Sequence, residues 1–355
     1  MHQTTPTPNA EPIDATLAEP LRVGEPDVSG PLAVFPIFGP APTLDYLSFS
    51  HGADQVAITE LEGGASVNDL TVENHGERPV LLYEGEELLG AQQNRVLDIS
   101  ILIAADAKTR IPVSCVEAGR WEGARRNERF RPSRQAADPE LRKLKQRRVR
   151  RRVASGGEAR ADQSETWNEV SGRIDALAVP SRTQAMSDVY EERRDTLGEL
   201  REPIRLHEGQ CGAVCTIAGR ISILDYVGRP DVWADLHPAL LEGYALDALR
   251  LAKAGKASAA APEPPEIGTV RGFTLLVTDS PGEDRRHEAG IGETIRFAAG
   301  GVAGSALAAP TAEGASELVQ LTAFPEGDDA PGPTSGPSRS RARVERPSRR
   351  RRRSR

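Results

Sequence analysis

Six short runs of apolar and β-branched residues follow one another over residues 31–117, separated by clusters of Gly, Asn, Asp and Pro. Runs of this length between turn-forming residues are typical of β-strands. Within residues 97–103, Leu97 and every second residue after it are apolar, which is the period of two of an extended strand. The pattern therefore predicts a β-rich N-terminal half. The runs are LAVFPIF, QVAITEL, DLTVEN, PVLLYE, RVLDISILI and RIPVSCVE.

The middle of the chain carries helix-start signals instead. Asp138 followed by Pro139 is suited to the cap and first position of one helix. Asp162 and Glu165 have the spacing of a capping box at the start of a second helix. Residues 181–197 indicate a third, weaker helix. We expect a helical middle segment after the strands.

Strand patterns return toward the C-terminal end. Residues 212–227 predict two strands joined by an Ala–Gly turn, and VRGFTLLVT, GETIRFAA and ELVQLTAFP predict further strands. A helical pattern over 231–252 contains Pro238, which predicts a break there. The fold class that we expect is therefore α+β, as a single domain over residues 31–325.

Both ends of the chain are predicted to be disordered. The sequence is 38% hydrophobic and 4% aromatic, which is low for a chain folded throughout its length. Residues 1–30 are rich in Pro, Thr, Glu and Asp, and residues 326–355 form an Arg-rich tail. Neither segment shows a periodic pattern.

The sequence also bears on compartment and chemistry. No apolar run approaches the length of a membrane helix, and the N-terminal segment does not resemble a signal peptide. Three cysteines without a framework spacing favour reduced thiols, so we expect a cytoplasmic protein without membrane contact. Cys211 and Cys215 lack a second ligand pair, and we expect neither a metal site nor a cofactor. Cys115 shares a strand face with Ile111 and Val113, which favours a core position.

The net charge of −7 conceals two basic segments. Residues 339–355 carry nine net positive charges and residues 125–152 carry ten. Such segments attract nucleic acids or acidic partners. However, 40 of the 45 basic residues are Arg, a bias that the base composition of the coding DNA would also produce. Nucleic acid is therefore not expected as the primary partner, whereas an acidic partner for the tail remains open.

The segment 83–95, YEGEELLGAQQNR, joins two predicted strands and is longer than a hairpin connection needs. Leu88 and Leu89 should be buried, so we expect the segment to fold back on the domain. Its carboxylates, carboxamides and arginine suit a hydroxyl-rich anionic ligand. The same groups could equally form a structural network that satisfies its own backbone. Trp121 either covers the core at a strand end or stacks on a base.

Three segments together resemble a known family. They are GEELLGAQQNR (85–95), IPVSCVEAGRW (111–121) and DQSETW (162–167), and we call them the motif segments. In this order they are similar to the ARG and Rhodanese-Phosphatase-superfamily-Associated Protein (ARPP) domain. The motif positions are Glu86, Gln93, Asn94, Arg95, Ser114, Glu117, Arg120, Trp121, Asp162 and Gln163.

The resemblance implies a role in NAD and ADP-ribose metabolism, because the family's name records a gene association with ADP-ribosyl glycohydrolases. Three hypotheses follow. The domain binds or hydrolyses an ADP-ribose-like nucleotide, with Arg95 or Arg120 on a phosphate. Alternatively, it is a non-enzymatic interaction protein whose motif segments form an internal network. Third, the Arg runs associate with nucleic acid.

Overall fold

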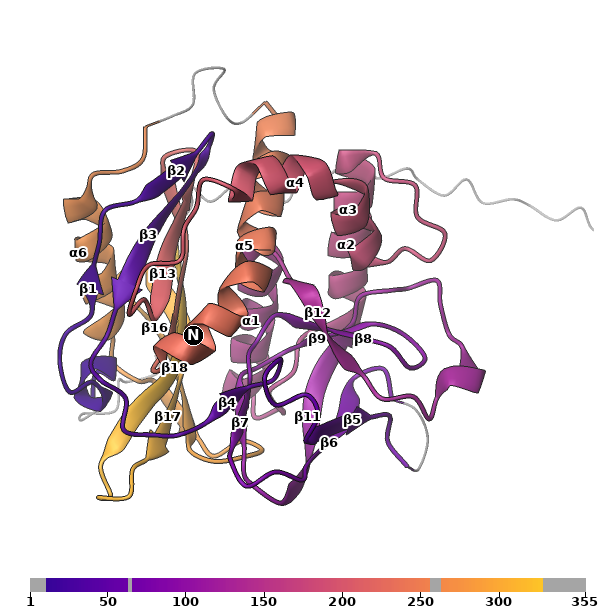
Figure 1. The fold of residues 1–355 in the computed structure, drawn as a ribbon, viewed down its shortest axis with the longest axis horizontal. Helices are drawn as coiled ribbons and strands as arrows, with labels where there is room; N and C mark the ends of the chain where they lie inside the picture. The colour runs from indigo at the N-terminus through magenta and orange to yellow at the C-terminus, as the bar shows by residue number, and fades with distance from the viewer. Residues whose placement is uncertain (1–10, 63–65, 256–262, 328–355) are drawn as a thin grey trace, which may run out of the picture. The chain divides into compact units, whose positions relative to one another are not determined.

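The computed structural model of the protein describes residues 11–62, 66–255 and 263–327 (Figure 1). One compact unit ends at Pro325, and a second, short unit begins at Glu326. The first unit is an α+β domain with strands in its N-terminal half, helices in the middle and strands again at its C-terminal end, as the sequence predicts. Residues 328–355, most of the predicted tail, lie outside the described residues.

The largest sheet contains nine strands from both ends of the domain. Its order is β1-β3-β13-β14-β18-β17-β16-β15, with β2 also on β3, and every pair is antiparallel. Ala218 and Gly219 both have positive φ between β13 and β14, which is the backbone of the predicted Ala–Gly turn. The strands are β1 (Arg22–Val23), β2 (Asp27–Ser29), β3 (Leu32–Phe38), β13 (Gly212–Ile217), β14 (Arg220–Val227), β15 (Asp284–Arg286), β16 (Glu293–Ala299), β17 (Val302–Pro310) and β18 (Ser316–Pro325).

Two smaller sheets come from the N-terminal half. A three-stranded sheet has the order β10-β7-β4, and a six-stranded sheet has the order β12-β8-β9-β11-β6-β5. Strand β12 is therefore an edge strand. The members are β4 (Leu47–Ser48), β5 (Val56–Thr59), β6 (Asp69–Asn74), β7 (Val80–Leu82), β8 (Glu86–Leu89), β9 (Arg95–Leu97), β10 (Ile101–Ile103), β11 (Ala107–Cys115) and β12 (Arg131–Ala136).

Six α-helices occur in the described residues, and none is long and apolar enough to cross a membrane. Asp138 caps α1 and Asp162 caps α2, as their sequence context predicts. Two short 3-10 helices, η1 (Ile13–Thr16) and η2 (Gly123–Arg125), complete the fold. The α-helices are α1 (Pro139–Ala154), α2 (Gln163–Leu177), α3 (Met186–Glu192), α4 (Arg194–Arg201), α5 (Pro230–Lys253) and α6 (Ile267–Thr278).

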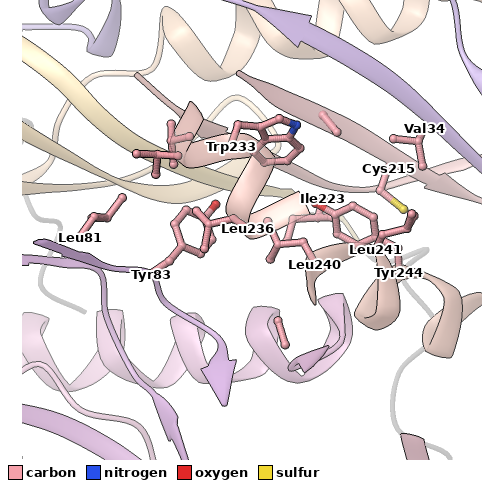
Figure 2. Packing of buried hydrophobic residues seen from close by; sticks show 14 of the residues in the cluster. Val34, Leu81, Tyr83, Cys215, Ile223, Trp233, Leu236, Leu240, Leu241 and Tyr244 are labelled. Carbon is pink, nitrogen blue, oxygen red and sulfur yellow. The ribbon is translucent and has the colours of Figure 1, made fainter. Parts of the chain in front are cut away.

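Helix α5 is the hub of the core. Its apolar side chains pack against the large sheet through residues such as Cys215 and Ile223, and against the N-terminal half through Leu81 and Tyr83 (Figure 2). The same helix contacts β12 and α4. Burial on several sides explains why the predicted break at Pro238 is wrong: α5 continues through it, because packing outweighs one lost backbone hydrogen bond.

Two other predictions are corrected by the structure. VRGFTLLVT forms helix α6, not a strand, because Val270, Phe273 and Val277 recur at helical spacing and pack into a second core cluster on the large sheet. Residues 11–30, predicted to be disordered, contain η1, β1 and β2. There Ile13 is fully buried and β1 and β2 both pair with β3. Residues 1–10 lie outside the described residues.

A buried ion cluster joins four parts of the domain around Arg142 of α1. The guanidinium donates two hydrogen bonds to Asp225 of β14, at 2.6 and 2.9 Å, and two to Glu84, at 2.6 and 3.1 Å. Tyr83 and Tyr244 each donate to Asp225 at 2.6 Å. Arg142 and Asp225 are fully buried and Glu84 nearly so, so a charge without its partner would be costly here.

Gly85 permits the approach of Arg142 to Glu84. Its φ is +88°, and a Cβ at this position would lie 2.7 Å from Cδ of Arg142. Only a residue without a side chain fits both constraints. The first glycine of the first motif segment, Gly85, therefore has a structural explanation.

We predict that Arg142→Met lowers the free energy of unfolding by about 3–5 kcal/mol, because it leaves two carboxylates buried without a cation. Urea unfolding measures this change. The control is Arg151→Met on the exposed part of the same helix, which should stay within about 0.5 kcal/mol of wild type. An Arg142→Met variant as stable as this control would show that the cluster contributes nothing to the fold.

Candidate functional site

A groove of about 1070 Å³ lies along the edge strand β12. Its lining comes from β12, the loop that precedes it, the end of β8 and helices α3, α4 and α5. Its size reaches the upper end of that of small-molecule sites in proteins. The groove is therefore large enough for a ligand with several recognition groups.

Seven arginines line this groove, and three of them differ from the others in their side-chain contacts. The side chains of Arg129, Arg131 and Arg134 are exposed, and none of them makes a hydrogen bond or salt bridge within the described residues. Arg129 and Arg131 act only at longer range, on Glu73 and Glu128. The other four are each bound to a neighbouring carboxylate, for example Arg201 to Glu242 at 3.2 Å. Guanidinium groups without a protein partner are available for phosphate or carboxylate.

The helices contribute carboxylates to the same groove. Asp188 and Glu191 belong to α3, and Asp235 and Glu242 belong to α5. Carboxylate oxygens accept hydrogen bonds from hydroxyl groups. The groove thus combines cationic groups on β12 with acceptors on the helices, which suits a ligand that has both phosphates and hydroxyls.

Of the ten motif positions, Asn94 and Arg120 line the groove. Arg120 is held in place by Glu117 at 2.6 Å, by Oδ1 of Asn94 at 3.1 Å and by the carbonyl oxygen of Ala91 at 2.8 Å. Glu117 also accepts from the backbone N–H of Asn94 at 3.2 Å. These contacts fasten the loop after β11 to the segment before β9.

Arg95 and Gln93 are buried beneath this pair. The guanidinium of Arg95 is fully buried and contacts the carbonyl oxygen of Gln93 at 3.0 Å and Glu60 at 3.3 Å. The Gln93 side chain donates to the carbonyl oxygen of Glu117 at 2.9 Å and accepts from Sγ of Cys115 at 2.9 Å. Arg95 therefore has no access to a ligand in this structure.

Cys115 is a buried core residue, as its strand position predicts. Burial raises the pKa of its thiol to about 12, so the nucleophilic thiolate is not populated near neutral pH. Cys211 and Cys215 are also buried and free. No group of metal-ligating side chains occurs in the described part of the chain.

Ser114, Asp162 and Gln163 have structural partners as well. Ser114 donates to Asp98 at 2.7 Å, and Asp162 caps α2. The Gln163 carboxamide pairs with both backbone groups of Cys115, at 2.8 and 2.9 Å, and so acts like one residue of a neighbouring strand. This explains why a DQ pair opens the third motif segment.

Glu86 and Trp121 have contrasting environments. Glu86 is buried and accepts one hydrogen bond from the backbone N–H of Tyr83 at 2.7 Å. Trp121 is 51% exposed, so the prediction that it covers the core is wrong. Its neighbour Arg120 lines the groove, but Trp121 itself does not belong to the lining.

Several groove residues escaped the sequence analysis. Arg131, Ser133, Arg134 and Gln135 lie in β12, inside the basic segment that also contains α1. The segment RPSRQA shows no alternation of apolar and polar residues, so local periodicity does not mark it as a strand. Leu88 is buried and Leu89 half-buried, as predicted for a segment that folds back.

Comparison with protein families finds one match. The family described as the ARG and Rhodanese-Phosphatase-superfamily-associated Protein domain matches residues 20–324. No curated protein and no solved structure matches the chain. The family match begins between η1 and β1 and ends in β18, so it covers nearly the whole first unit.

Burial raises the pKa of Glu86 to about 8. A carboxyl whose folded-state pKa is raised stabilises the protein fully below its ordinary pKa, and that stabilisation is lost as the pH rises through about 8. We predict that Glu86→Gln, which cannot ionise, gains melting temperature relative to wild type as the pH rises from about 4.5 to about 8. The exposed control Glu208→Gln should show no such trend. Parallel pH profiles for wild type and Glu86→Gln would contradict the prediction.

Proposed function

The chain belongs to the ARG and Rhodanese-Phosphatase-superfamily-associated Protein domain family, and on that premise we propose that it binds an ADP-ribose-like nucleotide in the groove along β12. One observation carries the proposal. The groove presents three arginines whose side chains make no hydrogen bond or salt bridge to the described part of the chain, beside two motif side chains, Asn94 and Arg120. A ligand with a diphosphate and sugar hydroxyls supplies an anion for these arginines and hydrogen-bond donors for the carboxylates of the groove.

The arginines of β12 take the place that Arg95 and Arg120 held in the sequence hypothesis. Arg95 is fully buried, and the side chain of Arg120 is 11% exposed and bound to Glu117. Arg131 and Arg134 are exposed and both line the groove, so we assign both to one diphosphate. Hydrogen bonds between charged groups of this kind each contribute about 1.5–3 kcal/mol.

A second candidate function is that of an interaction protein whose motif segments act as an internal brace. It is favoured by the contacts of the motif positions, because Glu86, Gln93, Arg95, Ser114, Asp162 and Gln163 bind other parts of the chain and lie outside the groove lining. This internal brace is compatible with a ligand site, since the contacts that hold Asn94 and Arg120 in place leave both residues in the groove lining.

We predict that the full chain binds ADP-ribose with a dissociation constant on the order of micromolar, and that Arg131→Ala and Arg134→Ala each weaken binding about tenfold or more. Titration calorimetry measures these affinities. Arg151→Ala, an exposed arginine outside the groove, is the matched control and should bind like wild type. Absence of binding heat with both ADP-ribose and NAD would refute the proposed function.

The brace makes a separate prediction. Asn94→Ala removes one of the three acceptors of Arg120 and the acceptor of the Gly90 N–H, and it should lower the melting temperature by several degrees. Thermal unfolding without ligand measures this directly. An Asn94→Ala variant that keeps full stability and loses only ligand affinity would exclude the brace.

A further inference from the structure

The pairing of β12 with β8 contains a wide irregularity at the groove. Leu88 faces Pro132 and Glu86 faces Ala136, so Glu87 alone faces the three residues between them. Extra residues on one strand form a bulge, which bends the strand and turns its side chains in new directions. Ser133, Arg134 and Gln135 form this bulge, and all three line the groove.

The carboxyl group of Glu87 fills the space under the bulge. Glu87 is 1% exposed, and its Oε2 accepts from Oγ of Ser133 at 3.0 Å and from Nε2 of Gln135 at 2.6 Å. Its Oε1 is buried and has no hydrogen-bond partner among the described residues. Ser133 and Gln135 therefore each direct a donor inward, to the same carboxyl oxygen of Glu87.

This arrangement determines what the two side chains offer to a ligand. A serine hydroxyl has one donor and two acceptor positions. At Ser133, Glu87 takes the donor and the backbone N–H of Gln135 occupies one acceptor position at 3.4 Å, which leaves one acceptor position for a ligand. A glutamine carboxamide whose nitrogen faces the carboxyl presents its oxygen on the other side. The oxygens of Ser133 and Gln135 thus make an acceptor subsite in the groove that Arg131 also lines.

We propose that this bulge subsite accepts hydrogen bonds from ligand hydroxyl groups, so that the groove selects phosphorylated sugars and nucleotides over phosphate groups alone. The inference rests on the proposed function and specifies its ligand class. Phosphate oxygens bind the exposed guanidiniums of Arg131 and Arg134. At Ser133 the same oxygens meet an acceptor, whereas a sugar hydroxyl supplies the donor that the subsite lacks.

Glu87 is a positioning residue in this proposal. It is buried under the bulge and holds the orientation of both groove side chains without touching the ligand. Burial raises its pKa to about 8, and a carboxyl that carries its proton on Oε1 still accepts both hydrogen bonds at Oε2. Without this acceptor, the Ser133 hydroxyl would be free to turn and donate to a phosphate.

The test compares ADP-ribose with inorganic pyrophosphate, which has the anionic groups but no sugar hydroxyls, on the full chain by titration calorimetry. Ser133→Ala should weaken ADP-ribose binding about tenfold and leave pyrophosphate binding unchanged. Arg131→Ala should weaken the binding of both. Equal loss of both ligands in Ser133→Ala, or no loss of either, would overturn the inference and leave the proposed function intact. A wild-type chain that binds neither ligand would refute the proposed function itself.

Variants of Glu87 separate positioning from stability. In Glu87→Ala the ratio of the ADP-ribose affinity to the pyrophosphate affinity should fall at least about fivefold, because Ser133 and Gln135 become free to donate. Glu87→Gln retains an oxygen acceptor and should restore most of the ratio. A purely structural role for Glu87 would weaken both ligands in proportion and leave the ratio unchanged, which would contradict the proposal.

Discussion

The buried guanidinium of Arg142 is the interaction on which the rest of the domain depends. It holds Glu84, directly before the first motif segment, and Asp225, in the centre of the large sheet, within hydrogen-bonding distance of one helix. Because each of these charges is buried, each requires the others, and the sheets and α1 can meet in one arrangement only. The same contact holds Gly85, directly before the start of β8, against Arg142. Because β12 pairs with β8, the position of Gly85 also determines the position of β12 and its groove.

Most residues of the motif segments have a structural role. Gln93, Arg95 and Gln163 satisfy buried backbone and side-chain groups around Cys115, which otherwise would be costly to bury. At the edge of this internal hydrogen-bond network, the side chains of Asn94 and Arg120 line the groove. Long stretches of polar residues can thus characterise a family without each residue touching a ligand. In the proposed function the ligand contacts belong to β12, where the side chains of Arg131 and Arg134 form no hydrogen bond or salt bridge with any described residue.

Sequence patterns anticipated the α+β class, most strands and both aspartate caps, because these depend on local periodicity and capping chemistry. They failed where packing decides the outcome. Pro238 lies within a helix that is buried on several sides, and Val270 to Val277 pack as a helix in spite of their β-branched residues. The groove could not be predicted either, since it joins Arg131 of an edge strand to Glu242 of a helix 111 residues later.

Hydrogen exchange with and without ADP-ribose is the most direct test of the central claim that the β12 groove is the ligand site. The account predicts slower exchange on ligand addition for amides of β12, residues 131–136, and of the preceding loop, with unchanged exchange in β16 and β17 on the large sheet. Unchanged exchange at β12 under saturating ligand, or protection confined to the large sheet, would contradict it.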